Sequence, residues 1–280
     1  MREVNVKLIN EKIYEAFSEL CFKYEDDTKN KIEKAYETST GREKKVLELL
    51  MENEKEAYEK RVPLCQDTGM AVVKLEIGQD VHMTDGNIAE AVNEAVRKAY
   101  KDSYLRLSVV DDPLFERKNT KDNTPALITY EIVPGDKVKV YCMAKGFGSE
   151  NMSRVKMLVP ADGEAGVIDF VVDAVRQAGP NPCPPVIVGV GIGGTMEQAA
   201  LLAKRMTARA LDSVNPDPRY AALEDEILRR INQLGIGPAG IGGRCTALKV
   251  NIAAAPTHIA GMPAAVNMCC HAARHAHTVL

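Results

Sequence analysis

The residues from Gly179 to Arg205 constrain the fold of this chain most, because they read in succession as a stiff loop, a strand, a glycine turn and a helix. The loop holds Cys183 among three prolines, Pro182, Pro184 and Pro185. Proline fixes its own φ and biases the residue before it away from the helical region. The thiol of Cys183 is therefore expected on a stiff, extended loop, which suits a ligand position.

The apolar run Val186–Val190 predicts a fully buried strand, and the following helix is expected to have Thr195 as its N-cap. The intervening glycines match G-x-G-x-x-G, which allows a dinucleotide site, a turn whose amides face a carboxylate, or close backbone packing. A dinucleotide site also needs an acid at the end of the next strand. The nearest acid at that distance, Asp212, falls at the end of the helix, so close packing is favoured.

The remaining pattern predicts an α/β or mixed α+β fold with a helical layer at the N-terminus. Hydrophobic residues make up 45% of the 280 residues, which is enough for a packed core. The predicted helices cover residues 4–24, 27–38, 42–61, 85–102 (with Asp85 as N-cap), 163–178, 196–211 and 220–234. Strands are predicted at 71–77 and, as a hairpin across Pro134-Gly135-Asp136, at 126–133 and 137–144. Residues 103–125 are expected to form a long irregular loop, and loops of that length in compact domains are usually functional or disordered.

Charge and hydropathy exclude several classes of protein. The net charge of -3, with both signs interspersed, provides no basic face for nucleic acid, and no apolar run approaches the roughly 20 residues of a membrane span. The first residues form an amphipathic pattern without the apolar core of a signal peptide. A cytoplasmic location is therefore expected.

Seven cysteines without regular spacing, in a chain with no export signal, are expected to be reduced thiols. There is no C-x-x-C pair, so any metal site has to gather ligands from distant loops. Three stiff polar loops contain candidates: Cys65-Gln-Asp-Thr-Gly, the Cys183 loop, and the segment with His258, Cys269 and Cys270. Each thiol alone is more simply a buried, inert side chain. Three converging thiolates, however, would suit an iron-sulfur cluster with one iron open to a substrate oxygen.

Four motifs together resemble class I fumarate hydratase and L-tartrate dehydratase, the iron-sulfur hydro-lyases: CQDTG at 65–69, KGFGSEN at 145–151, NPCPP at 181–185 followed by VGVGIGGT, and PTHIA through Cys270 to RHAH. The resemblance runs from about residue 40 to the end and is to the alpha subunit of the two-subunit form. It implies a [4Fe-4S] cluster held by Cys65, Cys183 and Cys270, with Cys269 as the alternative third ligand. It also implies one iron-sulfur hydro-lyase alpha domain over residues 1–280, in which residues 1–61 form the helical layer and 62–280 bind cluster and substrate.

The same resemblance implies the substrate contacts: Gln66, Asp67, Arg106, the backbone of Gly146 to Gly148, and His258. Asp67 and His258 are the catalytic candidates, with Asp67 supporting the base. An arginine can bind a dicarboxylate bidentately and a histidine can bond the hydroxyl. Phe147 stands where the family often has glycine. His271, His275 and His277 have no carboxylates spaced for zinc and are expected to be structural.

The implied reaction is the reversible hydration of fumarate to L-malate, with L-tartrate dehydration as the close alternative. The family's beta domain, which supplies further cationic residues and a hydroxyl that serves as base, is absent from this chain. We therefore expect a beta subunit as partner in an α₂β₂ heterotetramer. Two other classes stay open: a non-catalytic iron-sulfur or scaffold protein, and a nucleotide-binding module built on the glycines at 189–194.

Overall fold

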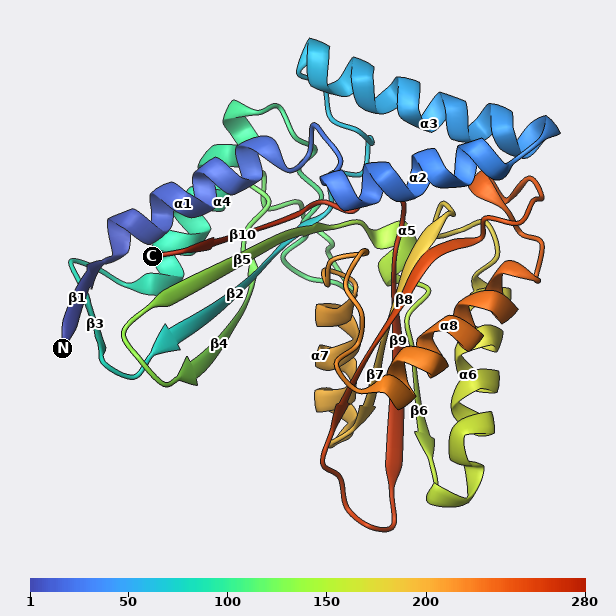
Figure 1. The fold of residues 1–280 in the computed structure, drawn as a ribbon. Coiled ribbons are helices and arrows are strands. Elements are labelled where there is room, and N and C mark those ends of the chain that lie inside the picture. Colours follow the sequence, from blue (N-terminus) through green and yellow to red (C-terminus); the bar gives the residue numbers. More distant parts are fainter. The chain divides into compact units, whose positions relative to one another are not determined.

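The computed structural model describes residues 1–280 and divides them into two compact units (Figure 1). The first unit comprises Met1–Lys23, Glu54–Phe147 and Arg274–Leu280, and the second comprises Tyr24–Asn53 and Gly148–Ala273. Each unit has its own sheet and its own apolar core. The fold is mixed α/β as predicted, whereas the single domain over residues 1–280 stays a prediction.

The first unit is built on a four-stranded sheet in the order β10-β5-β2-β4. Its strands are β2 (Met70–Gly78), β4 (Leu127–Val133), β5 (Val138–Lys145) and β10 (His275–Val279). Helices α1 (Val6–Glu19) and α4 (Ile88–Asp102) cover one face of this sheet. A separate parallel pair consists of β1 (Arg2–Asn5) and β3 (Val81–Thr84). The core lies between helices and sheet because α1 repeats Ile9, Ile13 and Phe17 at helical spacing, all fully buried.

The predicted hairpin at residues 126–144 is wrong. Strand β2 lies between β4 and β5 and pairs with both, parallel to β4 and antiparallel to β5. The turn at Gly135 therefore spans two strand spacings, about 10 Å, rather than one. The end of β2 fits under this turn because Gly78 has no side chain; a Cβ there would meet the Gly135 carbonyl oxygen at 2.3 Å. Turn chemistry identified the two strands but not the third strand between them.

The second unit has a four-stranded sheet in the order β6-β9-β7-β8. Its strands are β6 (Arg154–Leu158), β7 (Val186–Gly193), β8 (Ala247–Ala255) and β9 (Met262–Cys269). Helices α6 (Gly163–Ala178) and α8 (Pro218–Asn232) bury one face, and α7 (Met196–Met206) covers the other. Helix α2 (Asp26–Thr38) lies near β8, and α3 (Gly41–Lys60) carries the boundary between the units at residues 53 and 54. Short helical turns are α5 (Phe147–Glu150), η1 (Pro160–Asp162) and η2 (Pro238–Gly240).

The glycines of the G-x-G-x-x-G match serve close packing between β7 and α7. A Cβ on Gly189 would lie 2.1 Å from the carbonyl oxygen of Ala203, and a Cβ on Gly191 would lie 2.1 Å from that of Ala199. Both glycines lie within β7, not at a phosphate-binding turn. The close-packing interpretation is confirmed at these two positions.

Several helix ends differ from the predicted ones. Helix α1 begins at Val6 instead of residue 4, because residues 2–5 form β1 and the Asn5 side chain accepts a hydrogen bond from the amide of Lys7. Helix α4 has Asn87 as its N-cap instead of Asp85. Helix α7 ends at Met206 rather than residue 211, and Thr195 occupies its N-cap position without a side-chain bond to an amide. Helix α6 spans residues 163–178 as predicted.

The long irregular segment predicted between α4 and β4 is confirmed. Residues 103–125 contain no helix or strand and only one isolated bridge, between Val110 and Asn119. None of the helices combines the length with the apolar character needed to cross a membrane.

Candidate functional site

The Cys65-Gln-Asp-Thr-Gly loop of the first unit is held from three directions. The Thr68 hydroxyl, which is buried, accepts from the amide of Arg106 at 2.9 Å and donates to its carbonyl at 3.3 Å. The Tyr100 hydroxyl donates to the carbonyls of Thr68 and Gly69 at 3.0 and 3.2 Å. Gly69 has a φ of 76°, and a Cβ there would meet the Lys145 backbone at 2.7 Å. The loop is therefore a fixed platform that presents Cys65, Gln66 and Asp67.

The Asp67 carboxylate is oriented by backbone amides of two segments. One oxygen accepts from the amide of Gly69 at 3.0 Å and the other from the amide of Phe147 at 2.8 Å. Gly146 permits this approach, since a Cβ there would lie 3.2 Å from Asp67 Oδ2. The structure thus joins two predicted elements of the first unit through Asp67: the CQDTG loop and the Gly146 end of the glycine loop. Phe147 has no left-handed φ and is about half exposed, so its backbone position does not require glycine.

Two buried cations beside Asp67 were missed in the sequence. The Arg274 side chain is 2% exposed, donates to the carbonyl oxygen of Asp67, and would lie 3.1 Å from a Cβ on Gly146. Lys145 is 1% exposed, and its amine donates to the carbonyl of Gly146 at 3.3 Å. Arginine and lysine are rarely buried without a partner. Their positions as the first residues of the KGFGSEN and RHAH motifs were the only sequence signal.

Arg106 and Gln66 are the exposed polar side chains of this region. The backbone of Arg106 is fixed by Thr68, while its guanidinium forms no hydrogen bond or salt bridge. Gln66 accepts a bond of 3.3 Å from the Cys65 thiol. An exposed guanidinium on an anchored backbone is suited to bidentate binding of a carboxylate.

The Cys183 loop belongs to the second unit and differs from the extended loop predicted. Cys183 is exposed and has a left-handed φ of 53°, because its amide turns back to the carbonyl of Pro180 at 3.0 Å. The next residue is fixed by a bond of 2.8 Å from the amide of Ala239 to the carbonyl of Pro184. Stiffness is present as expected, but it comes from a tight turn.

Cys183 and Cys270 flank the same end of the second sheet. Strands β7 and β9 are antiparallel with Ile187 opposite Cys269, so the start of β7 meets the end of β9. Cys183 precedes β7 by three residues, and Cys270 follows β9 directly. Cys269 is 5% exposed within β9, whereas Cys270 is partly exposed beyond the strand. The next residue, His271, forms a hydrogen bond of 2.8 Å with the Tyr24 hydroxyl.

His258 lies at the opposite end of that sheet. It belongs to the turn between β8 and β9, where Gly193 is paired with Ala255 and the Thr257 hydroxyl donates to Gly194. The length of β7, roughly 23 Å at 3.3 Å per residue, separates this turn from the end that carries Cys183 and Cys270. His258 is exposed, and its Nδ1 accepts from the amide of Ala260. Gly148, the other end of the glycine loop, belongs to the second unit and not to the first. A Cβ on Gly148 would lie 3.2 Å from the carbonyl oxygen of Asn181.

The other cysteines have surroundings that disfavour the thiolate. Burial raises the pKa of Cys21 to about 11 and the pKa of Cys142 and Cys245 to about 12. None of the seven forms a disulfide.

Neither unit contains a cluster of three or more His, Cys, Asp or Glu side chains arranged to hold a metal ion. Cys65 lies in the first unit and Cys183 and Cys270 in the second, so their shared cluster stays a prediction.

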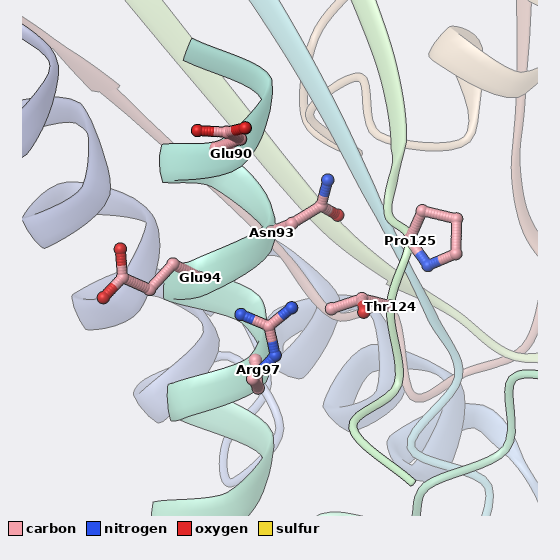
Figure 2. A pocket seen from close by; sticks show the side chains of 6 residues that line it. All are labelled: Glu90, Asn93, Glu94, Arg97, Thr124 and Pro125. Carbon is pink, nitrogen blue, oxygen red and sulfur yellow. The ribbon is translucent and has the colours of Figure 1, made fainter. Parts of the chain in front are cut away.

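A surface hollow of about 410 Å³ in the first unit contains none of the predicted site residues (Figure 2). It is lined by side chains of α4 together with Thr124 and Pro125. Two of its polar side chains already have partners in the fold: Asn93 accepts from the amide of Ala126, and Arg97 pairs with Asp122 at 2.8 Å. This hollow is therefore part of the scaffold that carries the 103–125 loop.

Comparison with known proteins shows which family the chain belongs to. The model of the fumarate hydratase (Fumerase) family matches residues 10–279. The chain belongs to this family. A relative from Methanocaldococcus jannaschii, provisionally named L(+)-tartrate dehydratase subunit alpha, is 40% identical over 275 residues, which cover 96% of each chain.

Relatives named L(+)-tartrate dehydratase subunit alpha also occur in bacteria. The protein from Escherichia coli strain UTI89 is 32% identical over 254 residues, covering 89% of this chain and 83% of its own length. The protein from Shigella boydii is 31% identical with the same coverage. The fumarate hydratase family resemblance seen in the sequence is confirmed, and the chain is a subunit of a hydro-lyase.

Proposed function

We propose that this chain is the alpha subunit of an iron-sulfur hydro-lyase that removes water from, or adds it to, a four-carbon dicarboxylate. The observation that carries the proposal is the separation of the seven thiols into two sets. Cys65, Cys183 and Cys270 lie on anchored loops outside the cores, whereas the others lie in the interior or carry a strongly raised pKa. Accessible thiols on stiff loops are what a cluster requires of its ligands.

The donor set fits a [4Fe-4S] cluster better than a hard cation, because all three candidate ligands are soft sulfur atoms. Cys270 is proposed as the third ligand in preference to Cys269, which packs within β9. When bound, such a cluster with one iron lacking a protein ligand supplies a Lewis acid for departure of the substrate hydroxyl.

The chain's own side chains bind and orient the substrate. Arg106 holds one carboxylate, with its guanidinium exposed and its backbone fixed by Thr68. Gln66 and the amides of Gly146 and Gly148 supply further polar contacts. Asp67 supports the base that takes the proton from the carbon next to the departing hydroxyl, so that hydroxyl and proton leave together as water. Its carboxylate is fixed by Gly69 and Phe147, which limits the orientation entropy lost on reaction.

Two substrates are supported by different observations. The family description favours fumarate, hydrated to L-malate, and the names of the relatives favour L(+)-tartrate at least as well. The two reactions differ by one substrate hydroxyl, which a few pocket groups can accommodate. Because the relatives are named alpha subunits, we propose a beta subunit as partner, in an α₂β₂ assembly that completes the pocket.

His258 is proposed to form a hydrogen bond with the substrate hydroxyl, and its location determines which copy of the chain it can serve. Within one copy of the second unit it lies at the end of the sheet away from Cys183 and Cys270. It therefore acts on the site of a second alpha copy in the assembly. In a two-fold assembly both copies use the same surface for the interface, so each copy can supply its His258 to the other.

The test is anaerobic reconstitution of the chain with iron and sulfide, followed by iron counting and EPR spectra with and without L-malate or L-tartrate. We expect about four irons per chain and a spectrum that shifts with the true substrate. Serine at Cys65, Cys183 or Cys270 is expected to lower the iron content, and serine at Cys142 to leave it unchanged. Full cluster loading in all three ligand variants would overturn the ligand assignment. A loaded alpha-beta pair that turns over neither substrate would favour a non-catalytic iron-sulfur protein.

A further inference from the structure

The second unit contains a cavity that the hydro-lyase site does not use. Its volume is about 300 Å³ and its walls come from α2, the first turn of α3, the last turns of α8 and residues 244–248. Ala35, Leu228 and Leu248 supply apolar surface. Cavities of this size lie at the lower end of the range for small-molecule sites, roughly 300–1,000 Å³.

Positively charged side chains outnumber negatively charged ones in the lining of this cavity. Lys31, Lys34 and Arg244 line it, and none of the three forms a salt bridge. The only acid in the lining is Glu43, and one of its oxygens already accepts from the amides of Arg244 and Cys245 at 2.7 and 2.6 Å. Three unpaired cations around one concave surface create a positive potential that attracts anions.

The surroundings of Lys31 confirm that positive charge is crowded there. Burial lowers the pKa of Lys31 below its usual range, and the charges of Lys249 and Lys34 lower it further. Asp212 and Asp225 act in the opposite direction, but more weakly. Crowded like charges cost free energy in the empty protein, and a bound anion would remove that cost.

The wall of the cavity is rigid and is continuous with the Cys183 loop. Asn232 fixes the wall by accepting from the amides of Thr246 and Ala247, both at 2.9 Å. The Thr246 carbonyl accepts from the amide of Val186 at 2.9 Å, where β7 leaves the proline loop. The segment that forms the cavity wall is thus hydrogen-bonded to the strand that follows Cys183.

We propose that this cavity binds a small anion carrying at least two negative charges, either a phosphate compound or a dicarboxylate. Lys31, Lys34 and Arg244 pair with the charges, and the apolar surface accommodates the body of the ligand. The proposal stands independently of the hydro-lyase assignment, since it uses none of the residues of that site.

The experiment is calorimetric titration of the purified full-length chain, at low salt, with pyrophosphate and with succinate. Four proteins are compared: the native chain, K31Q/K34Q, K98Q/K101Q as a matched control, and R106Q, which alters the proposed hydro-lyase site. The control removes two lysines at the same spacing from α4, outside the cavity. All four lysines lie on helix surfaces, and circular dichroism checks that each variant is folded.

We expect one or both probes to bind the native chain and the control equally, and K31Q/K34Q at least about tenfold more weakly, because two charge-assisted contacts are lost. Binding also slows hydrogen exchange at residues 31–39 and 242–248. Pyrophosphate binding alone identifies a phosphate site, and succinate binding alone a carboxylate site. Equal binding by the native chain, K31Q/K34Q and K98Q/K101Q, or no binding of either probe, overturns the proposal. A further outcome is that R106Q abolishes succinate binding while K31Q/K34Q retains it. Succinate then binds at the hydro-lyase site, and this outcome also overturns the proposal.

Discussion

The side-chain amide of Asn267 donates hydrogen bonds of 2.9 Å to Oε2 of Glu150 and to Oγ of Ser153. Asn267 is 4% exposed in β9, three residues before Cys270, and Glu150 belongs to the KGFGSEN motif. The other carboxylate oxygen of Glu150 pairs with Lys204 of α7. Two motifs far apart in the sequence are therefore joined inside the second unit by one buried amide.

Replacing Asn267 with leucine is expected to impair cluster loading as well as stability. The change removes two part-buried hydrogen bonds, to Glu150 and Ser153, and each lost bond costs roughly 1–3 kcal/mol. It also loosens the end of β9 that leads to Cys270. Iron content after reconstitution and the free energy of unfolding measure the two effects separately.

Asn251 provides the matched control for Asn267. It is fully buried in β8, lies opposite Gly189, as Asn267 does, and donates to the carbonyls of Met206 and Arg209 at 3.0 and 3.1 Å. N251L should lose similar stability while its folded fraction loads iron normally. If N251L and N267L lose iron to the same extent, the link between Asn267 and the cluster site is wrong.

Replacing Asp67 with asparagine is expected to reduce kcat of the alpha-beta pair by about 100-fold or more, the usual contribution of an acid-base group. Asparagine has one acceptor oxygen, so its amide nitrogen would face the amide of Gly69 or of Phe147. Steady-state kinetics with malate and with tartrate measure the loss. D112N is the control, because Asp112 likewise accepts from backbone amides, those of Leu114, Phe115 and Glu116. An equal fall in kcat for D112N would contradict a specific role of Asp67.

The sequence predicted those parts of the fold and site that depend on local pattern. The apolar run at Val186 identified β7, and proline and glycine marked the loops of Cys65 and Cys183. The insertion of β2 between β4 and β5 depends on long-range pairing that no turn encodes. The burial of Arg274 and Lys145 ran against the usual exposure of charged residues. The position of His258 followed only from the order of the strands in the sheet.

The stability of the first unit is expected to depend on the ionised state of Asp122. Burial alone would raise the pKa of this carboxyl, but hydrogen bonds from Arg97 and Thr124 outweigh it and lower the pKa from 3.8 to about 2. A depressed pKa stabilises the fold above the unfolded value and loses that effect as pH falls through the folded value. D122N should therefore be less stable than the native chain at pH 7, and the difference should shrink between about pH 4 and pH 2. Urea unfolding at several pH values measures it, and a difference that stays constant over that range would contradict the role of the charge.

The position of His258 leads to a complementation experiment. H258A and C65S alpha chains are each expected to give an inactive enzyme with the beta subunit. Co-expressed, they can form mixed assemblies in which the intact cysteines of the H258A copy meet the intact His258 of the C65S copy. If two-fold pairing is random, half of the assemblies are mixed and half of their sites are complete, so activity should return to roughly a quarter of the native value.

The matched control is co-expression of C65S with C183S, which lack ligands of the same cluster and cannot complement one another if each copy supplies all three cysteines of its own site. Activity near zero in both mixtures would mean that His258 serves its own copy, which the length of β7 between His258 and Cys183 argues against. Full activity of H258A alone would remove His258 from the reaction altogether. Recovery only in the H258A mixture would show that one alpha chain donates His258 to the site of another, so that two alpha copies are needed to build one complete pocket.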